Sequence, residues 1–152
     1  MNIIPIDFKK NPHLLEGVRS VNQNVITRAL KKEGFKPSTK EPVRVKVGSN
    51  LRTEGFVIEK DEIMPTAKYT PGHPLVFVEE DGSSARYHNI YRVSYEHSTS
   101  LYFLSEEKRR VALAEIGEKM MLMMLALEFS GYATFSNEAL GRDFLVLGRR
   151  EN

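Results

Sequence analysis

The chain has 152 residues, of which 41% are hydrophobic and 28% charged, a balance that excludes wholesale disorder. Its longest apolar stretch, Met120 to Leu127, has eight residues, whereas a membrane-spanning helix needs about 20, and no signal peptide is evident. The absence of cysteine excludes disulfides, thiolate nucleophiles and zinc sites built on sulfur. We therefore expect a soluble, cytoplasmic protein.

Charge is distributed unevenly along the chain. Residues 1–53 carry 11 Lys and Arg against 4 Asp and Glu, a net charge of +7. The other 99 residues carry 11 against 16, a net charge of −5. A basic first third favours an anionic partner, of which nucleic acid is the commonest. The alternative interpretation is a basic surface that is merely solvated.

The first third is expected to be largely helical. A short extended segment at residues 2–8 precedes Asn11 and Pro12, which are typical of a helix start. Apolar residues then recur at helical spacing and Gly34 follows a basic turn, so a helix over residues 12–33 is predicted. A break near Ser20, which would cap a shorter helix, is the alternative. Residues 36–42 form a polar, proline-bounded linker.

From residue 43 the pattern changes to the alternation of strands. Short strands are predicted at residues 43–47, 55–59, 75–79, 85–88 and 91–95, with a further candidate at 101–104. Gly48 to Asn50 and Asp81-Gly82 are turn signals, and the proline-rich residues 61–74 indicate a loop. Closely spaced short strands separated by turns predict a small antiparallel barrel.

The last third is predicted to be a long helix followed by a strand. Ser105 with two following acids is a helix start, and Gly131 is a stop. The methionine-rich second half of this helix is apolar all round and is expected to be covered on every side, as core or as a homodimer interface over residues 111–129. A short helical turn within 136–142 and a strand at 144–147 complete the chain.

Residues 42–96 resemble the KOW and Tudor-type family of small SH3-like barrels. The resemblance rests on the basic alternating strand Pro42-Val-Arg-Val-Lys-Val, a polar turn, Gly55 at the motif's glycine position and the aliphatic strand after it. Together with the helices and strand predicted on either side, it leads us to expect an α+β protein with three segments: a strand and basic helix at 1–41, an SH3-like barrel at 42–104, and a helix and strand at 105–152. Such barrels attach to transcription and translation machinery, and some phage proteins that bind DNA or modify host transcription carry one.

The candidate nucleic-acid-binding residues are cations, polar donors and one aromatic ring. Lys and Arg neutralise phosphates, polar turn residues donate to them, and a ring between cations can stack on unpaired bases. Strand alternation exposes two cations, the next turn adds polar donors, and the later strands and long loop add the rest: Arg44, Lys46, Asn50, Arg52, Thr53, Lys68, Arg86, Tyr87 and Arg92. The basic helix adds Arg28, Lys31 and Lys32.

Catalytic and cofactor motifs are not found. His97-Ser98-Thr99 has the form used by two-histidine phosphoesterases, but those enzymes need two copies and no other histidine repeats it. The four histidines lack ligand spacing, so neither a metal nor a cofactor is expected.

The sequence thus favours a non-enzymatic nucleic-acid-binding protein, with double-stranded DNA ahead of RNA, acting in transcription modulation or phage host takeover. A protein-interaction adaptor for RNA polymerase or the ribosome, or a self-assembling structural or virion protein, is the alternative.

Overall fold

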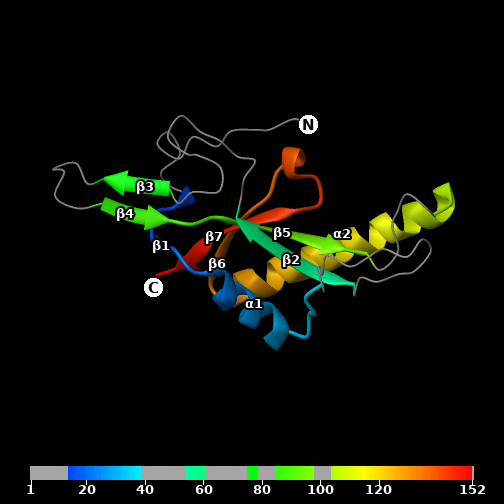
Figure 1. The fold of residues 1–152 in the computed structure, drawn as a ribbon, viewed down its shortest axis with the longest axis horizontal. Coiled ribbons are helices and arrows are strands. Elements are labelled where there is room, and N and C mark those ends of the chain that lie inside the picture. Colours follow the sequence, from blue (N-terminus) through cyan, green and yellow to red (C-terminus); the bar gives the residue numbers. More distant parts are fainter. Residues whose placement is uncertain (1–13, 39–53, 61–74, 79–84, 98–103, 152) are drawn as a thin grey trace, which may run out of the picture.

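The computed structural model describes residues 14–38, 54–60, 75–78, 85–97 and 104–151. Two helices accompany an open antiparallel sheet of five strands, and a separate two-stranded sheet lies to one side (Figure 1). The fold is therefore α+β, as expected. The elements in chain order are β1 (Val18–Arg19), α1 (Gln23–Lys32), β2 (Gly55–Lys60), β3 (Leu75–Val78), β4 (Ala85–His88), β5 (Tyr91–Glu96), α2 (Glu106–Phe129), β6 (Tyr132–Phe135), the 3-10 turn η3 (Glu138–Leu140) and β7 (Phe144–Arg150).

Strand β7 is the centre of the five-stranded sheet. Its residue Val146 pairs with Tyr91 of β5 and with Thr134 of β6, which must therefore lie on opposite edges. Strand β1 pairs with the end of β7, on the same edge of β7 as β5. Strand β2 pairs with the other edge of β5. Strands from all three predicted segments thus share one sheet, while the boundaries between those segments stay predictions.

The closed SH3-like barrel is not confirmed, because the sheet formed by the described strands is open. The predicted strands at 55–59, 75–79, 85–88 and 91–95 are present as β2, β3, β4 and β5. However, β3 and β4 pair only with each other, whereas β5 pairs with β7. The expected strand at 43–47, the turns at 48–50 and 81–82 and the loop at 61–74 lie outside the described residues, as does all of 101–104 but Leu104, which is not in a strand.

The outer edge of β2 is occupied by the segment predicted to be a linker. The amide of Phe56 donates to the carbonyl of Lys36 at 3.0 Å, and Ser38 donates back to Phe56 at 2.9 Å. The side chain of Gln23 donates to the carbonyl of Ile58 at 2.9 Å. A Cβ on Gly55 would lie 2.2 Å from the Lys36 carbonyl oxygen, so glycine is needed here for a close backbone approach.

The core has two parts because β7 buries both faces. Phe144 and Val146 face a cluster that α1 and α2 complete, and Leu145 and Leu147 face a second cluster with Val18 and η3. The uninterrupted apolar run that predicted this strand reflects this double burial. Fully buried His88, at the end of β4, hydrogen-bonds through Nε2 to the carbonyl of Leu147 and ties β4 to the centre of the sheet.

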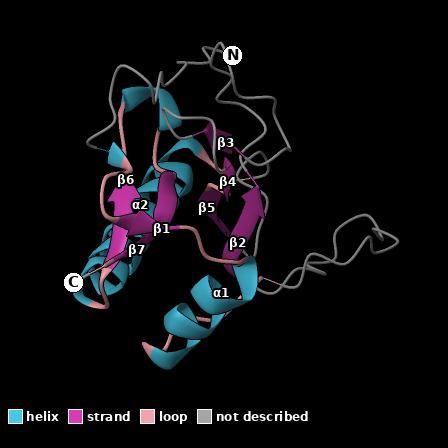
Figure 2. Cartoon of the chain, turned by 90° about the vertical axis from the view of Figure 1, so that its left-hand side faces the viewer, coloured by secondary structure: helices cyan, strands magenta, loops and turns pink. Residues whose placement is uncertain are grey.

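Helix α1 is shorter than the predicted helix over 12–33, which is wrong for residues 14–22. Gly17 has a φ of +67° and Val18 pairs with β7, so the chain is not helical there. The helix starts at Asn22, whose side chain accepts a hydrogen bond from the Val25 amide at 3.0 Å, rather than at Ser20. Figure 2 places α1 below the strands of the sheet.

Helix α2 matches its prediction in extent but not in burial. It is capped by Ser105 and ends before Gly131, which has a φ of +92°. Met120, Met123 and Leu127 are buried, whereas Met121, Leu122 and Leu125 are exposed and Phe129 is 90% exposed. The expectation that this half is covered on every side is therefore wrong for the single chain. The turn η3 and the strand β7 agree with expectation, while β1 and β6 were not predicted.

Candidate nucleic-acid interface

Helix α1 turns a basic face outward. Ile26 and Leu30 are buried against the sheet, and Arg28, Lys31 and Lys32 are exposed on the other side. Lys31 and Lys32 occupy the last turn, where cations also stabilise the helix dipole. Gly34, with a φ of +94°, ends the helix as the sequence predicted.

An arginine pair lies on β1 and β7. Arg19 is directly opposite Arg149 in the antiparallel register, so both side chains leave the same face of the sheet. Like charges in this position repel each other, and an anion between them would relieve the repulsion. Arg149 also lies over the ring of Tyr132, with 5.7 Å from the guanidinium carbon to the ring centroid. The next residue, Arg150, is exposed as well, but it is opposite Val18 in the same register, so its side chain leaves the other face of the sheet.

Glycine at position 148 allows this arrangement. Gly148 has a φ of +144°, and a Cβ there would lie 2.3 Å from the carbonyl oxygen of Arg19. Any other residue would push β1 away from β7 and separate the two arginines.

We call the exposed cations of α1, β1 and β7 the basic band: Arg19, Arg28, Lys31, Lys32, Arg149 and Arg150. Only three residues separate β1 from α1, and β1 pairs with the end of β7, so the start of α1 lies near that end. None of the six forms an ion pair within the described part of the chain. The exposed acids that adjoin the band in sequence are Glu16, Glu33 and Glu151, so its net charge remains positive.

The structure places the predicted site residues in different parts of the molecule. Arg28, Lys31 and Lys32 lie together on the exposed face of α1. Arg86 and Tyr87 lie in β4, opposite Phe77 and Val76 in the register. Half of the predicted set lies outside the described residues: Arg44, Lys46, Asn50, Arg52, Thr53 and Lys68.

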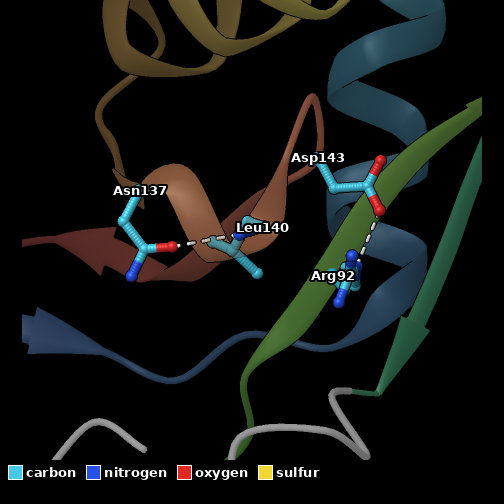
Figure 3. A network of polar contacts seen from close by, with 4 residues as sticks. All are labelled: Arg92, Asn137, Leu140 and Asp143. Atoms are coloured by element: carbon cyan, nitrogen blue, oxygen red, sulfur yellow. Dashed lines mark hydrogen bonds and ion pairs between the residues drawn. The ribbon is translucent and has the colours of Figure 1, made fainter. Parts of the chain in front are cut away.

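Arg92 is engaged in a structural ion pair. Its Nε donates to Asp143 Oδ2 at 2.7 Å, and both side chains are about four-fifths buried (Figure 3). Asp143 lies in the loop after η3. The turn η3 itself is capped by Asn137, whose side chain accepts a hydrogen bond from the Leu140 amide at 3.1 Å. The sequence could not anticipate this contact because the two residues are 51 positions apart. Arg92 thus joins β5 to the η3 loop.

The molecule also has an acidic groove, formed by α2, the strand β5 and Glu54, the residue before β2. It has a volume of about 230 Å³, and its lining combines three acids and one lysine with a tyrosine and two aliphatic side chains: Glu54, Tyr95, Glu115, Ile116, Glu118, Lys119 and Leu122. Burial and then the nearby Glu54 carboxylate raise the pKa of Tyr95 to about 12, because both disfavour a phenolate. This groove would repel a phosphate backbone, so it is not part of the same interface.

The sequence analysis did not predict Arg149 and Arg150 as site residues. A strand that ends in two arginines after a continuous apolar run signals an exposed basic end of a buried strand. What the sequence does not contain is the β1–β7 register that brings Arg19 beside them.

Comparison with known proteins adds no family to this description: no family model, curated protein or solved structure matches the chain. Within the described residues, no helix is long and apolar enough to cross a membrane. In the same part of the chain, no group of three or more His, Asp or Glu side chains is placed to hold a metal ion.

Proposed function

We propose that this chain is a non-enzymatic nucleic-acid-binding protein whose preferred ligand is double-stranded DNA, and that the basic band contacts its phosphates. The observation that carries the proposal is that six exposed cations, contributed by α1, β1 and β7, have no ion-pair partner within the described residues. Cations of this kind release condensed counterions when they meet a polyphosphate, which drives binding without sequence preference.

The separation of charge supports the same function. Acidic side chains gather in the groove beside α2, and the basic band lies on other elements. A polyanion would therefore be attracted to the basic band and repelled from the groove. A role in transcription modulation or phage host takeover, and the KOW-type barrel over residues 42–96, belong to this proposal as its finer part. In that form Arg44, Lys46 and Arg52 would extend the binding surface.

The test is the salt dependence of binding to a random duplex. We expect affinity to fall steeply as salt rises, and the triple variant Arg28→Ala, Lys31→Ala, Lys32→Ala to weaken binding at low salt about 10- to 100-fold. The slope of log affinity against log salt should become shallower by about 3, because three phosphate contacts are lost.

The matched control removes the same charge elsewhere, through Lys60→Ala, Lys108→Ala, Lys119→Ala, which are exposed residues outside the basic band. It should change affinity less than about threefold, since these cations are not expected to touch phosphate. Equal losses in the two variants would mean that net charge alone attracts DNA. No binding of the wild-type protein at low salt would refute the function.

A further inference from the structure

The exposed side of α1 carries an amide among its cations. Ile26 and Leu30 bury one side of this helix. The opposite side is exposed and consists of one amide and three cations, which we call the outer stripe: Asn24, Arg28, Lys31 and Lys32. The first three of these follow one another at steps of four and three residues, so they form one line along the helix.

The fold does not use the polar groups of Asn24 and Arg28. The helix is already capped by Asn22, and within the described residues neither side chain forms a hydrogen bond or an ion pair. An uncharged amide releases no counterions from a phosphate backbone, so the attraction of the basic band for DNA does not account for Asn24. In the major groove, however, the amide of asparagine forms two hydrogen bonds with adenine, and the guanidinium of arginine forms two with guanine.

The charges around the outer stripe suit a helix that lies between two phosphate strands. Residues 23–32 include no acid, and the C-cap Glu33 comes three residues after Leu30, which places it on the buried side of the helix. Cations stand at both ends, because Arg19 precedes α1 by a three-residue connection and Lys31 and Lys32 form its last turn. The ten-residue helix is about 15 Å long, close to the major-groove width of about 12 Å, so its ends can reach both strands.

We propose that α1 is a recognition helix that enters the major groove, where Asn24 contacts adenine and Arg28 contacts guanine. The inference rests on the proposed function and adds a sequence preference to it. On a duplex without the preferred base pairs, Arg28 contacts phosphate like the rest of the basic band. The two residues are about 6 Å apart along the helix, so the preferred A·T and G·C pairs should lie within about two or three base pairs of each other.

The first experiment selects bound duplexes from a pool whose central base pairs are random. We expect enrichment of duplexes that share an A·T and a G·C pair at this spacing. Their affinity should be about 100-fold higher than that of a duplex with both pairs changed, since each bidentate contact contributes about tenfold. Binding to the pool without enrichment would overturn the recognition helix and leave the proposed function standing. No binding to the pool at low salt would refute the proposed function, and this inference with it.

The second experiment assigns the preference to residues through the ratio of the affinities for the enriched and the changed duplex. Asn24→Ala should lower this ratio about tenfold through loss of the adenine contact. The control Lys32→Ala removes a phosphate contact, so it should lower both affinities and leave their ratio unchanged. An equal fall of the ratio in the two variants would overturn the role of Asn24.

The sharpest variant is Arg28→Gln, because glutamine forms its two hydrogen bonds with adenine rather than guanine. Repeating the selection with this variant should replace the G·C pair by an A·T pair at the same position. A merely structural role of Arg28 would not produce such an exchange, and an unchanged circular dichroism spectrum checks that the variant is folded. Retention of the G·C pair by the folded variant would overturn the role of Arg28.

Discussion

Replacement of Gly148 by alanine should be among the most damaging small changes in this protein. The new Cβ would lie 2.3 Å from the Arg19 carbonyl oxygen and 2.8 Å from Val18 Cγ1, both in β1. Strand β1 must then move outward, which disturbs the pairing of Val18 with Arg150 and of Arg19 with Arg149. The φ of +144° is also one that an L-residue rarely adopts. Backbone strain of about 1–3 kcal/mol and overpacking of about 1–3 kcal/mol together predict a loss of about 3–4 kcal/mol.

The assay is equilibrium unfolding in urea, with Gly117→Ala as the matched control. Gly117 lies inside α2 with nothing within 4 Å of its virtual Cβ, so the same chemical change should there stabilise the protein by about 0.5–1 kcal/mol. The two variants should thus shift the urea midpoint in opposite directions. The Gly148 variant should also bind DNA more weakly, since β1 carries Arg19 out of the basic band. A Gly148 variant within about 1 kcal/mol of wild type would refute the close β1–β7 approach.

Two further predictions concern single side chains. Because the pKa of Tyr95 is raised to about 12 in the folded state and is 10.0 otherwise, its contribution to stability is complete below pH 10 and is lost as the pH rises from 10 to 12. Two pKa units equal about 2.7 kcal/mol for a fully buried group, which solvent screening of partly exposed Tyr95 reduces to about 1 kcal/mol or less. Tyr95→Phe should remove this alkaline loss, measured as the urea midpoint at about pH 9 and about pH 11; an unchanged loss would contradict the assignment. Arg92→Ala should lower stability by about 1–2 kcal/mol through loss of the Asp143 pair, with DNA affinity changed less than about twofold; the reverse pattern would return Arg92 to the interface.

The sequence predicted most local elements because their signals are local. Ser105, Gly131 and the apolar run of β7 each act within a few residues, and α2 and β7 appear where these signals place them. Helix 12–33 failed because a long-range contact, Val18 with β7, outweighs helical spacing over residues 14–22. The strand β6 was missed because Tyr132–Phe135 is only four residues long and follows the helix stop directly.

The candidate site also divides into residues that local patterns predict and residues that long-range contacts bring together. The cations of α1 could be predicted because one helix face carries them, whereas the Arg19–Arg149 pair depends on a register between residues 130 positions apart. Gly55 was singled out as the glycine of the KOW-type motif. In the structure its lack of a side chain allows the close approach of the Lys36 to Ser38 backbone, a contact that the sequence pattern does not contain.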